Sequence, residues 1–163
     1  MKVLESVDVS APPEVIWNYV GDPSSYLHFI SGITRWEVQG DQQSGIGARY
    51  RMLMRVRSAE IGGLIEVVEY AELADLAWSS VTGLDQRGRW RLRERPDGLT
   101  RVELSLAYGV TGSGLAGWLS ERIAAPTIRG HLRRSLQQLK RLAEHDQLRD
   151  LAAQRRENRS PAA

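Results

Sequence analysis

The sequence contains no cysteine among its 163 residues, only three histidines and a single phenylalanine. Without cysteine, the chain can form no disulfide, thiolate metal site, iron–sulfur cluster or cysteine nucleophile. Three histidines are too few for a His-rich metal centre, and we expect neither a metal nor a cofactor. No apolar run approaches the ~18 residues of a membrane span, and the N-terminus lacks the pattern of a secretory signal. We therefore expect a soluble, cytoplasmic protein.

Lysine is also scarce, because Lys2 and Lys140 are the only lysines and the other 20 of the 22 basic residues are arginine. Guanidinium groups bind phosphate and carboxylate in a bidentate manner, but a GC-rich genome also favours arginine codons, and we favour this second cause. The charge is uneven, since residues 122–163 carry 10 basic and 4 acidic side chains. A basic helical face there would suit a membrane or a partner, whereas a solvated face is the ordinary interpretation.

The first 30 residues predict one strand followed by two short helices. Residues 2–10 alternate with period two, which places Val3, Val7 and Val9 on one face of a strand. A proline-rich start and the break at Gly21-Asp22-Pro23 delimit short helices at 12–20 and 23–30.

From residue 33 to residue 110 the pattern changes to strands that are separated by turns. Pro96-Asp97-Gly98 predicts a hairpin turn. The pair Gly62-Gly63 predicts a bulge or a close approach of two backbones inside one strand. The expected strands are 33–40, 48–57, 60–73, 75–83, 87–95 and 101–108.

A long helix is predicted from about 114 to 145, because apolar residues recur there at steps of three or four. Pro126 predicts a kink or a register break in its first half. Beyond His145 the apolar stripe weakens, and we expect residues 146–163 to form a basic C-terminal tail that is frayed or disordered. The stripe comprises Leu115, Leu119, Ile123, Ile128, Leu132, Leu136, Leu139 and Ala143.

This order of elements predicts a single α+β domain over residues 1–145. Short antiparallel strands need a cover for one apolar face, and the terminal helix is the candidate for it. We therefore expect a curved antiparallel β-sheet of about seven strands, wrapped around the long C-terminal helix, with the two short helices after the first strand. Such a geometry leaves a space between helix and sheet.

Three segments resemble the START-like or SRPBCC superfamily, which has the helix-grip fold, and within it the polyketide cyclase/dehydrase-like proteins. They are VDVSAPPEVIWNYVGDPSSYLHFISG near the N-terminus, GIGARYRM after a Gly-rich turn, and HLRRSLQQLKRLAE in the long helix. The resemblance covers residues 1–145 and implies a START-like ligand-binding domain with a hydrophobic cavity. The superfamily includes lipid carriers and aromatase/cyclases, so the fold alone does not decide between binding and catalysis.

Strand parity nominates the side chains that would line this cavity, because they lie on the less charged face of each strand. Apolar walls with a few polar tips are typical of small-molecule pockets, and methionines suit a wall that adapts to its ligand. Each of these side chains has plain core packing as its alternative interpretation. The candidates are Trp36, Tyr50, Met52, Met54, Trp78, Trp90, Leu92, Leu104 and Tyr108.

The sequence supports binding better than catalysis. It contains no paired-carboxylate motif, no G-x-S-x-G elbow and no metal signature. Residues 112–117 match G-x-G-x-x-G, but no parallel strand follows them, and we interpret them as a connection in which Ser113 caps the long helix. For a cyclase, weak catalytic candidates are His28, Tyr50 and Tyr108.

Our first hypothesis is a monomer or homodimer that binds a hydrophobic small molecule, such as a lipid, an acyl compound or a polyketide-like compound. The alternative is a polyketide cyclase/dehydrase-like enzyme acting on such a ligand, so that enzyme status stays open. A weaker alternative is an interaction module that uses the basic helix on a membrane or a partner. We expect no binding to nucleic acid, since aromatic residues are absent from the basic end.

Overall fold

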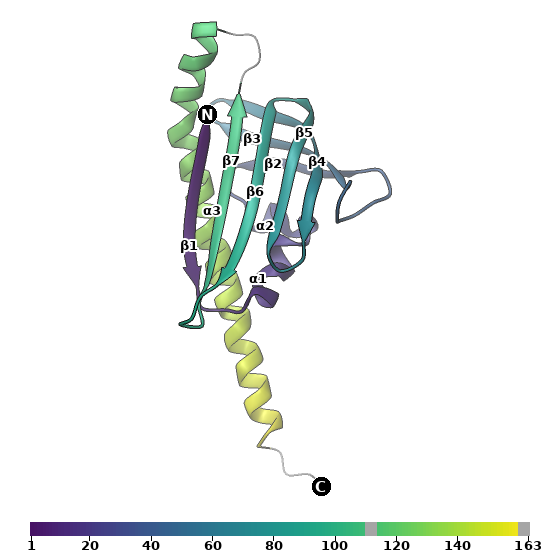
Figure 1. The fold of residues 1–163 in the computed structure, drawn as a ribbon, viewed down its shortest axis with the longest axis vertical. Helices are drawn as coiled ribbons and strands as arrows, with labels where there is room; N and C mark the ends of the chain where they lie inside the picture. The colour runs from purple at the N-terminus through teal and green to yellow at the C-terminus, as the bar shows by residue number, and fades with distance from the viewer. Residues whose placement is uncertain (110–113, 160–163) are drawn as a thin grey trace.

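Seven strands form one antiparallel sheet in the order β1-β7-β6-β5-β4-β3-β2. The computed structural model describes the backbone of residues 1–109 and 114–159, and the side chains of 1–109 and 124–159. Because β1 and β2 lie at opposite edges of the sheet, the short helices between them carry the chain from one edge to the other (Figure 1). The elements are β1 (Lys2–Val9), α1 (Pro13–Val20), the 3-10 turn η1 (Pro23–Ser25), α2 (Tyr26–Phe29), β2 (Ile33–Gln39), β3 (Arg49–Val56), β4 (Ala59–Ala71), β5 (Asp75–Gly83), β6 (Asp85–Glu94), β7 (Thr100–Gly109) and α3 (Gly114–Glu157).

This architecture confirms the predicted α+β fold, in which a curved antiparallel sheet packs against a long C-terminal helix. One inward-facing row of side chains on β6 and β7 includes Trp90, Leu92 and Val102, all of them buried. The apolar stripe of α3 covers the sheet, and its buried members are Ile128, Leu132, Leu136, Leu139 and Ala143. Burial of each large apolar side chain contributes about 1.5–3 kcal/mol, so this seam is the main source of stability.

The expected end of the long helix at residue 145 is wrong, because α3 continues to Glu157. Residues 146–157 are helical rather than frayed or disordered, and they extend beyond the sheet (Figure 1). Leu148 and Leu151 are exposed there, which explains why no apolar stripe marks this part of the helix. Pro126 lies inside α3 without ending it. Among the described residues, no helix is both long enough and apolar enough to cross a membrane.

The pairing of β4 with β5 is irregular, as is that of β2 with β3 between Ile33 and Arg35. The pairing of β4 shifts register between Leu64 and Ile65 and again between Val67 and Glu69, and such bulges increase the twist and bend of a strand. The expected close approach at Gly62-Gly63 is confirmed, since a Cβ on Gly62 would lie 2.2 Å from the Met52 carbonyl oxygen. The bulges themselves lie farther along the strand than that glycine pair.

Three arginines of β6 converge on the carboxylate of Asp75 at the start of β5. The guanidinium nitrogens of Arg93, Arg91 and Arg89 lie 2.7, 3.3 and 3.5 Å from its oxygens. Burial alone raises the pKa of Asp75, but the hydrogen bonds from Arg93 and Arg91 outweigh it and hold the pKa below its ordinary value of 3.8. The cluster therefore fixes β5 against β6 on the outer face of the sheet.

We expect Asp75→Asn to lower the free energy of unfolding by about 1–3 kcal/mol at pH 7, because it removes a charge that three guanidinium groups share. The lowered pKa contributes stability above pH 3.8 that is lost as the pH falls through the folded-state value. Urea titrations at several pH values measure both effects. Asp41→Asn, in the exposed loop after β2, is the control, and an equal loss in both variants would contradict the assigned role.

Candidate ligand-binding cavity

A small cavity of about 30 Å³ lies between the concave face of the sheet and α3. That volume is enough for a water molecule, which needs roughly 10–15 Å³ measured in this way. Its wall is almost entirely apolar and comes from helices as well as strands. The lining residues are Tyr26, Ile30, Ile33, Trp36, Met52, Met54, Trp78, Leu104, Leu106, Leu132 and Ser135.

Of the nine side chains nominated from strand parity, five line this cavity and four do not. Those that line it are Trp36, Met52, Met54, Trp78 and Leu104. Those that are buried in the core away from it are Tyr50, Trp90, Leu92 and Tyr108. Alternation identifies the inner face for these residues, but it does not predict the irregularity of β2 that brings Ile33 into the wall, nor which part of the inner face α1 and α2 cover. Trp90, for example, lies against Phe29 of α2, with ring centroids 6.1 Å apart.

Strand parity missed the lining residues that come from the helices. Tyr26 and Ile30 belong to the α2 segment, and Leu132 and Ser135 lie on α3. The apolar spacing of α2 and α3 was a usable signal for three of them, since it marked these positions as inward-facing. Nothing in the sequence marked Ser135, because periodicity does not tell whether a serine next to apolar helix positions faces the core or the solvent.

Trp36 is held in the cavity wall by two aromatic neighbours. Its ring stacks on Tyr50 at a centroid distance of 5.0 Å and an interplanar angle of 24°, and it lies 4.8 Å from the ring of Tyr26. The Tyr50 hydroxyl donates to the Gln43 carbonyl oxygen and the Tyr26 hydroxyl to that of Val20, both at 2.6 Å. Burial raises the pKa of Tyr50 to about 12 and raises that of Tyr26 further. Both hydroxyls therefore stay protonated and engaged at neutral pH.

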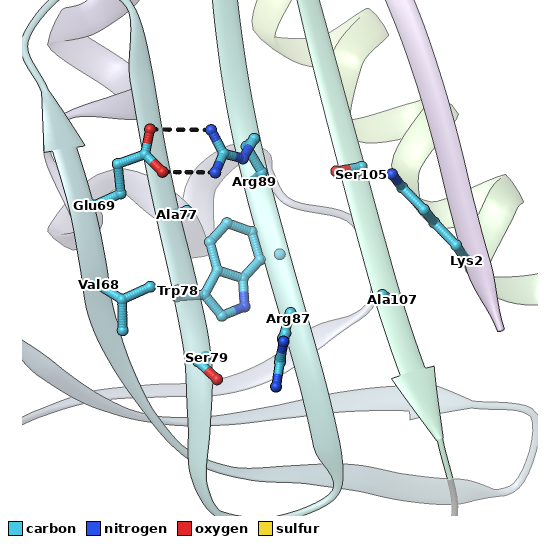
Figure 2. Close-up of a pocket in the computed structure, with 11 residues that line it drawn as sticks. Lys2, Val68, Glu69, Ala77, Trp78, Ser79, Arg87, Arg89, Ser105 and Ala107 are labelled. Atoms are coloured by element: carbon cyan, nitrogen blue, oxygen red, sulfur yellow. Dashed lines mark hydrogen bonds and ion pairs between the residues drawn. The ribbon is translucent and has the colours of Figure 1, made fainter.

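Trp78 owes its place in the wall to Gly88, its partner on the neighbouring strand β6. A Cβ on Gly88 would lie 1.9 Å from the indole ring, so only glycine leaves room for it. Figure 2 shows the ring extending from β5 toward β6. This close packing lets Trp78 border both the inner cavity and a hollow on the outer face of the sheet.

The outer hollow is larger, at about 480 Å³, but it is open to solvent and polar at its margins. Small side chains, among them Ala77, Ser79 and Ala107, form its floor. Its upper margin in Figure 2 is the two-bond ion pair of Arg89 with Glu69, at 2.5 and 3.0 Å. Because ligand sites are enclosed and mainly apolar, the inner cavity is the better candidate.

A short strap, residues 30–32, connects α2 to β2 and contributes Ile30 to the cavity wall, and polar groups tie it to α3. The Ser31 amide donates to the Ser135 hydroxyl at 2.9 Å, and that hydroxyl donates to the His131 carbonyl oxygen at 2.8 Å. The Ser31 hydroxyl lies 3.1 Å from His131 Nδ1. A Cβ on Gly32 would lie 2.5 Å from the His131 ring, so only a glycine at this position lets the strap come this close to the helix.

The contacts of His131 define its protonation state. Its Nε2 lies 2.9 Å from the Arg55 carbonyl oxygen and must donate, whereas Nδ1 accepts from the Arg134 guanidinium at 2.9 Å. The imidazole is therefore neutral, with its proton on Nε2. Burial lowers its pKa; the bond to the Arg55 carbonyl opposes this effect, and the charge of Arg134 adds to it. Periodicity along the helix gives no signal for the contacts of His131, so sequence reasoning missed this half-buried network.

The three weak catalytic candidates do not meet in the cavity. His28 is exposed on α2, and the Tyr50 hydroxyl is engaged by Gln43. The Tyr108 hydroxyl contacts the sulfur of Met1 at 3.6 Å. The part of the chain that the structure describes contains no group of three or more His, Asp or Glu side chains that could hold a metal ion. The expected Ser113 cap lies outside the described residues.

Residues 1–144 match the sequence model of the family described as polyketide cyclase / dehydrase and lipid transport. The chain belongs to this family. The comparison with curated proteins found no significant match. Membership agrees with the resemblance inferred from the N-terminal segment and the long helix, and it covers every residue that lines the cavity.

Solved structures share the fold of this family member at low sequence identity. A protein from Thermus thermophilus is 20% identical with a TM-score of 0.74, covering 88% of this chain and 97% of its own. The Zhui aromatase/cyclase from a Streptomyces species is 16% identical with a TM-score of 0.66, covering 93% and 95%. A START superfamily protein from Mycobacterium smegmatis is 15% identical with a TM-score of 0.60, covering 91% and 97%. These likenesses establish the helix-grip fold.

We expect the free energy of unfolding to decrease as the pH falls below 6.5, the ordinary imidazole pKa. The folded state lowers the pKa of His131, so the unfolded chain binds the proton first, and stability present above pH 6.5 is lost as the pH falls through the folded-state value. Urea titrations between pH 5 and 8, roughly the range in which histidine titrates, measure the effect. His131→Ala should flatten this dependence, whereas His28→Ala, on the exposed side of α2, should leave it intact.

Proposed function

We propose that this protein binds a hydrophobic small molecule, such as a lipid, an acyl compound or a polyketide-like compound, in the cavity between the sheet and α3. The observation that carries the proposal is an enclosed apolar wall, built jointly by α2, the concave strands and α3. The family description, which combines lipid transport with cyclase/dehydrase activity, supports a ligand of this class. A cytoplasmic location, a domain boundary at residue 145 and a monomeric or homodimeric state stay predictions.

The ligand must widen the cavity to enter, because about 30 Å³ holds no more than one or two water molecules. Two features of the wall favour widening. Met52 and Met54 are unbranched and can change rotamer at low cost. The strap, residues 30–32, is held to α3 largely by side-chain hydrogen bonds, each with a net worth of about 0.5–1.5 kcal/mol.

Neither alternative function has an observation of its own in its favour. A cyclase needs proton-transfer groups within reach of its substrate, and the candidate hydroxyls of Tyr50 and Tyr108 lie outside the cavity lining. A membrane-binding helix needs unpaired cations. On the part of α3 that lies over the sheet, Arg129 and Arg133 pair with Glu5, Lys140 pairs with Glu144, and Arg134 donates to His131 and Ser31.

We expect Met54→Phe to weaken the binding of N-phenyl-1-naphthylamine, an uncharged apolar fluorophore, by about tenfold, which corresponds to 1.4 kcal/mol. The stiffer ring fills the cavity from the β3 side and resists the widening that the probe requires. A fluorescence titration measures the affinity. Leu92→Met, buried in the core but away from the cavity, should leave it within twofold. Equal effects of the two substitutions would contradict the location of the site.

We expect Ser135→Ala to speed the uptake of the same probe about fivefold, as measured by stopped-flow fluorescence. The substitution removes the hydroxyl that accepts the Ser31 amide, so opening the strap costs one hydrogen bond less, on the order of 1 kcal/mol. Ser79→Ala, on the outer face of the sheet, is the matched control. If Ser135→Ala leaves the association rate unchanged, the strap is not the route of entry.

A further inference from the structure

Two hydrogen-bond donors in the cavity wall have no partner. The indole N–H groups of Trp36 and Trp78 are buried, and within the described residues neither makes a hydrogen bond. Both side chains line the cavity, one from β2 and the other from β5. A buried donor without a partner costs about 1–3 kcal/mol, so native proteins leave few of them. Two such donors belong to side chains that line one small cavity, and an acceptor bound there would satisfy them.

The oxygen atoms of the same wall are already engaged. The Tyr26 hydroxyl donates to the Val20 carbonyl oxygen. The Ser135 hydroxyl both accepts from Ser31 and donates to His131. The Met52 sulfur accepts weakly from the Gln86 amide at 3.6 Å. The hydroxyl protons of the wall are therefore engaged, and its free donors are the two indole N–H groups, while the acceptors left over are lone pairs on hydroxyl oxygens that already make hydrogen bonds.

We propose that the ligand of this cavity presents an oxygen acceptor, of the ketone or ester kind, to the indole N–H groups of Trp36 and Trp78, and carries no hydroxyl donor at that position. The inference rests on the proposed binding function and names the chemical class of its ligand. A carbonyl oxygen has two lone pairs and can accept from both indoles. A hydroxyl group would bring in a donor of its own, whose only acceptors in this wall are oxygens that already make hydrogen bonds, and a buried donor that fails to reach them costs free energy.

Three probes of nearly equal shape test this class directly: 2-acetylnaphthalene, 1-(2-naphthyl)ethanol and 2-ethylnaphthalene. They carry a carbonyl, a hydroxyl and a methylene group at the same position. Their affinities follow from displacement of N-phenyl-1-naphthylamine and are corrected for partitioning between water and cyclohexane, which removes the difference in their hydration. After correction, we expect the ketone to bind about fivefold more tightly than the hydrocarbon and more tightly than the alcohol, as one net hydrogen bond implies.

Two conservative variants remove the donors one at a time. Trp36→Phe and Trp78→Phe keep an aromatic ring in the wall but lose the N–H, and each should reduce the preference for ketone over hydrocarbon by at least twofold. Trp90→Phe is the matched control. The Trp90 indole N–H is also buried and has no hydrogen-bond partner within the described residues. Trp90, however, does not line the cavity. Its substitution should leave the preference unchanged.

A measurement on the unmodified protein keeps the test valid even if a variant fails to fold. In a ¹⁵N-labelled sample, the indole resonances of Trp36 and Trp78 should move downfield with the ketone and not with the hydrocarbon. Binding of all three probes with equal corrected affinities and equal indole shifts overturns the inference and leaves the proposed function standing. Failure of all three, and of N-phenyl-1-naphthylamine, to bind overturns the proposed function itself.

Discussion

Alternation along β6 is the constraint on which the rest of the structure depends, and the carboxylate of Asp75 with the three arginines that meet it occupies the outer face of that alternation. Arg89, Arg91 and Arg93 occupy alternate positions of β6, so their common partner holds that strand with one face outward. The positions between them place Trp90 and Leu92 in the core. A slip of one residue would exchange the two sets and bury the guanidinium groups. An outer-face ion cluster thus secures the inner apolar face against which α3 packs.

The side chains of the inner face have to fill the core and also to satisfy their polar groups, and at the cavity these two requirements conflict. Trp36 and Trp78 supply large apolar surface for the core, yet each brings an N–H that no neighbouring side chain accepts. A phenylalanine at either position would satisfy packing without that cost. The cavity wall therefore combines two indoles whose N–H groups lack partners with two methionines, and these are the features on which the proposed ligand depends.

The sequence allowed the strands to be predicted closely, because alternation between Arg89 and Trp90 is visible without a structure. It did not allow the end of α3 to be predicted, since Leu148 and Leu151 are exposed and leave no apolar stripe. For the cavity, parity identified Trp36 and Trp78 but not their helical neighbours. Which side chains of α2 and α3 reach a given strand depends on how the helices pack, and periodicity contains no information about it.

The strap, residues 30–32, gives the cavity a wall that is weaker than the rest of the core. Ile16 and Leu139 are held by apolar contact over their whole surface, and exposing them would cost about 1.5–3 kcal/mol each. The strap depends instead on hydrogen bonds of Ser31 to Ser135, His131 and Arg134, and on that of the Arg55 amide to the Gly32 carbonyl oxygen, and all of these groups can bond to water once the strap opens. Opening of the strap, as proposed for ligand entry, would leave the apolar contacts of α3 with the sheet in place. Neutral His131 belongs to this network, so the loss of stability that its lowered pKa predicts on acidification arises at the strap.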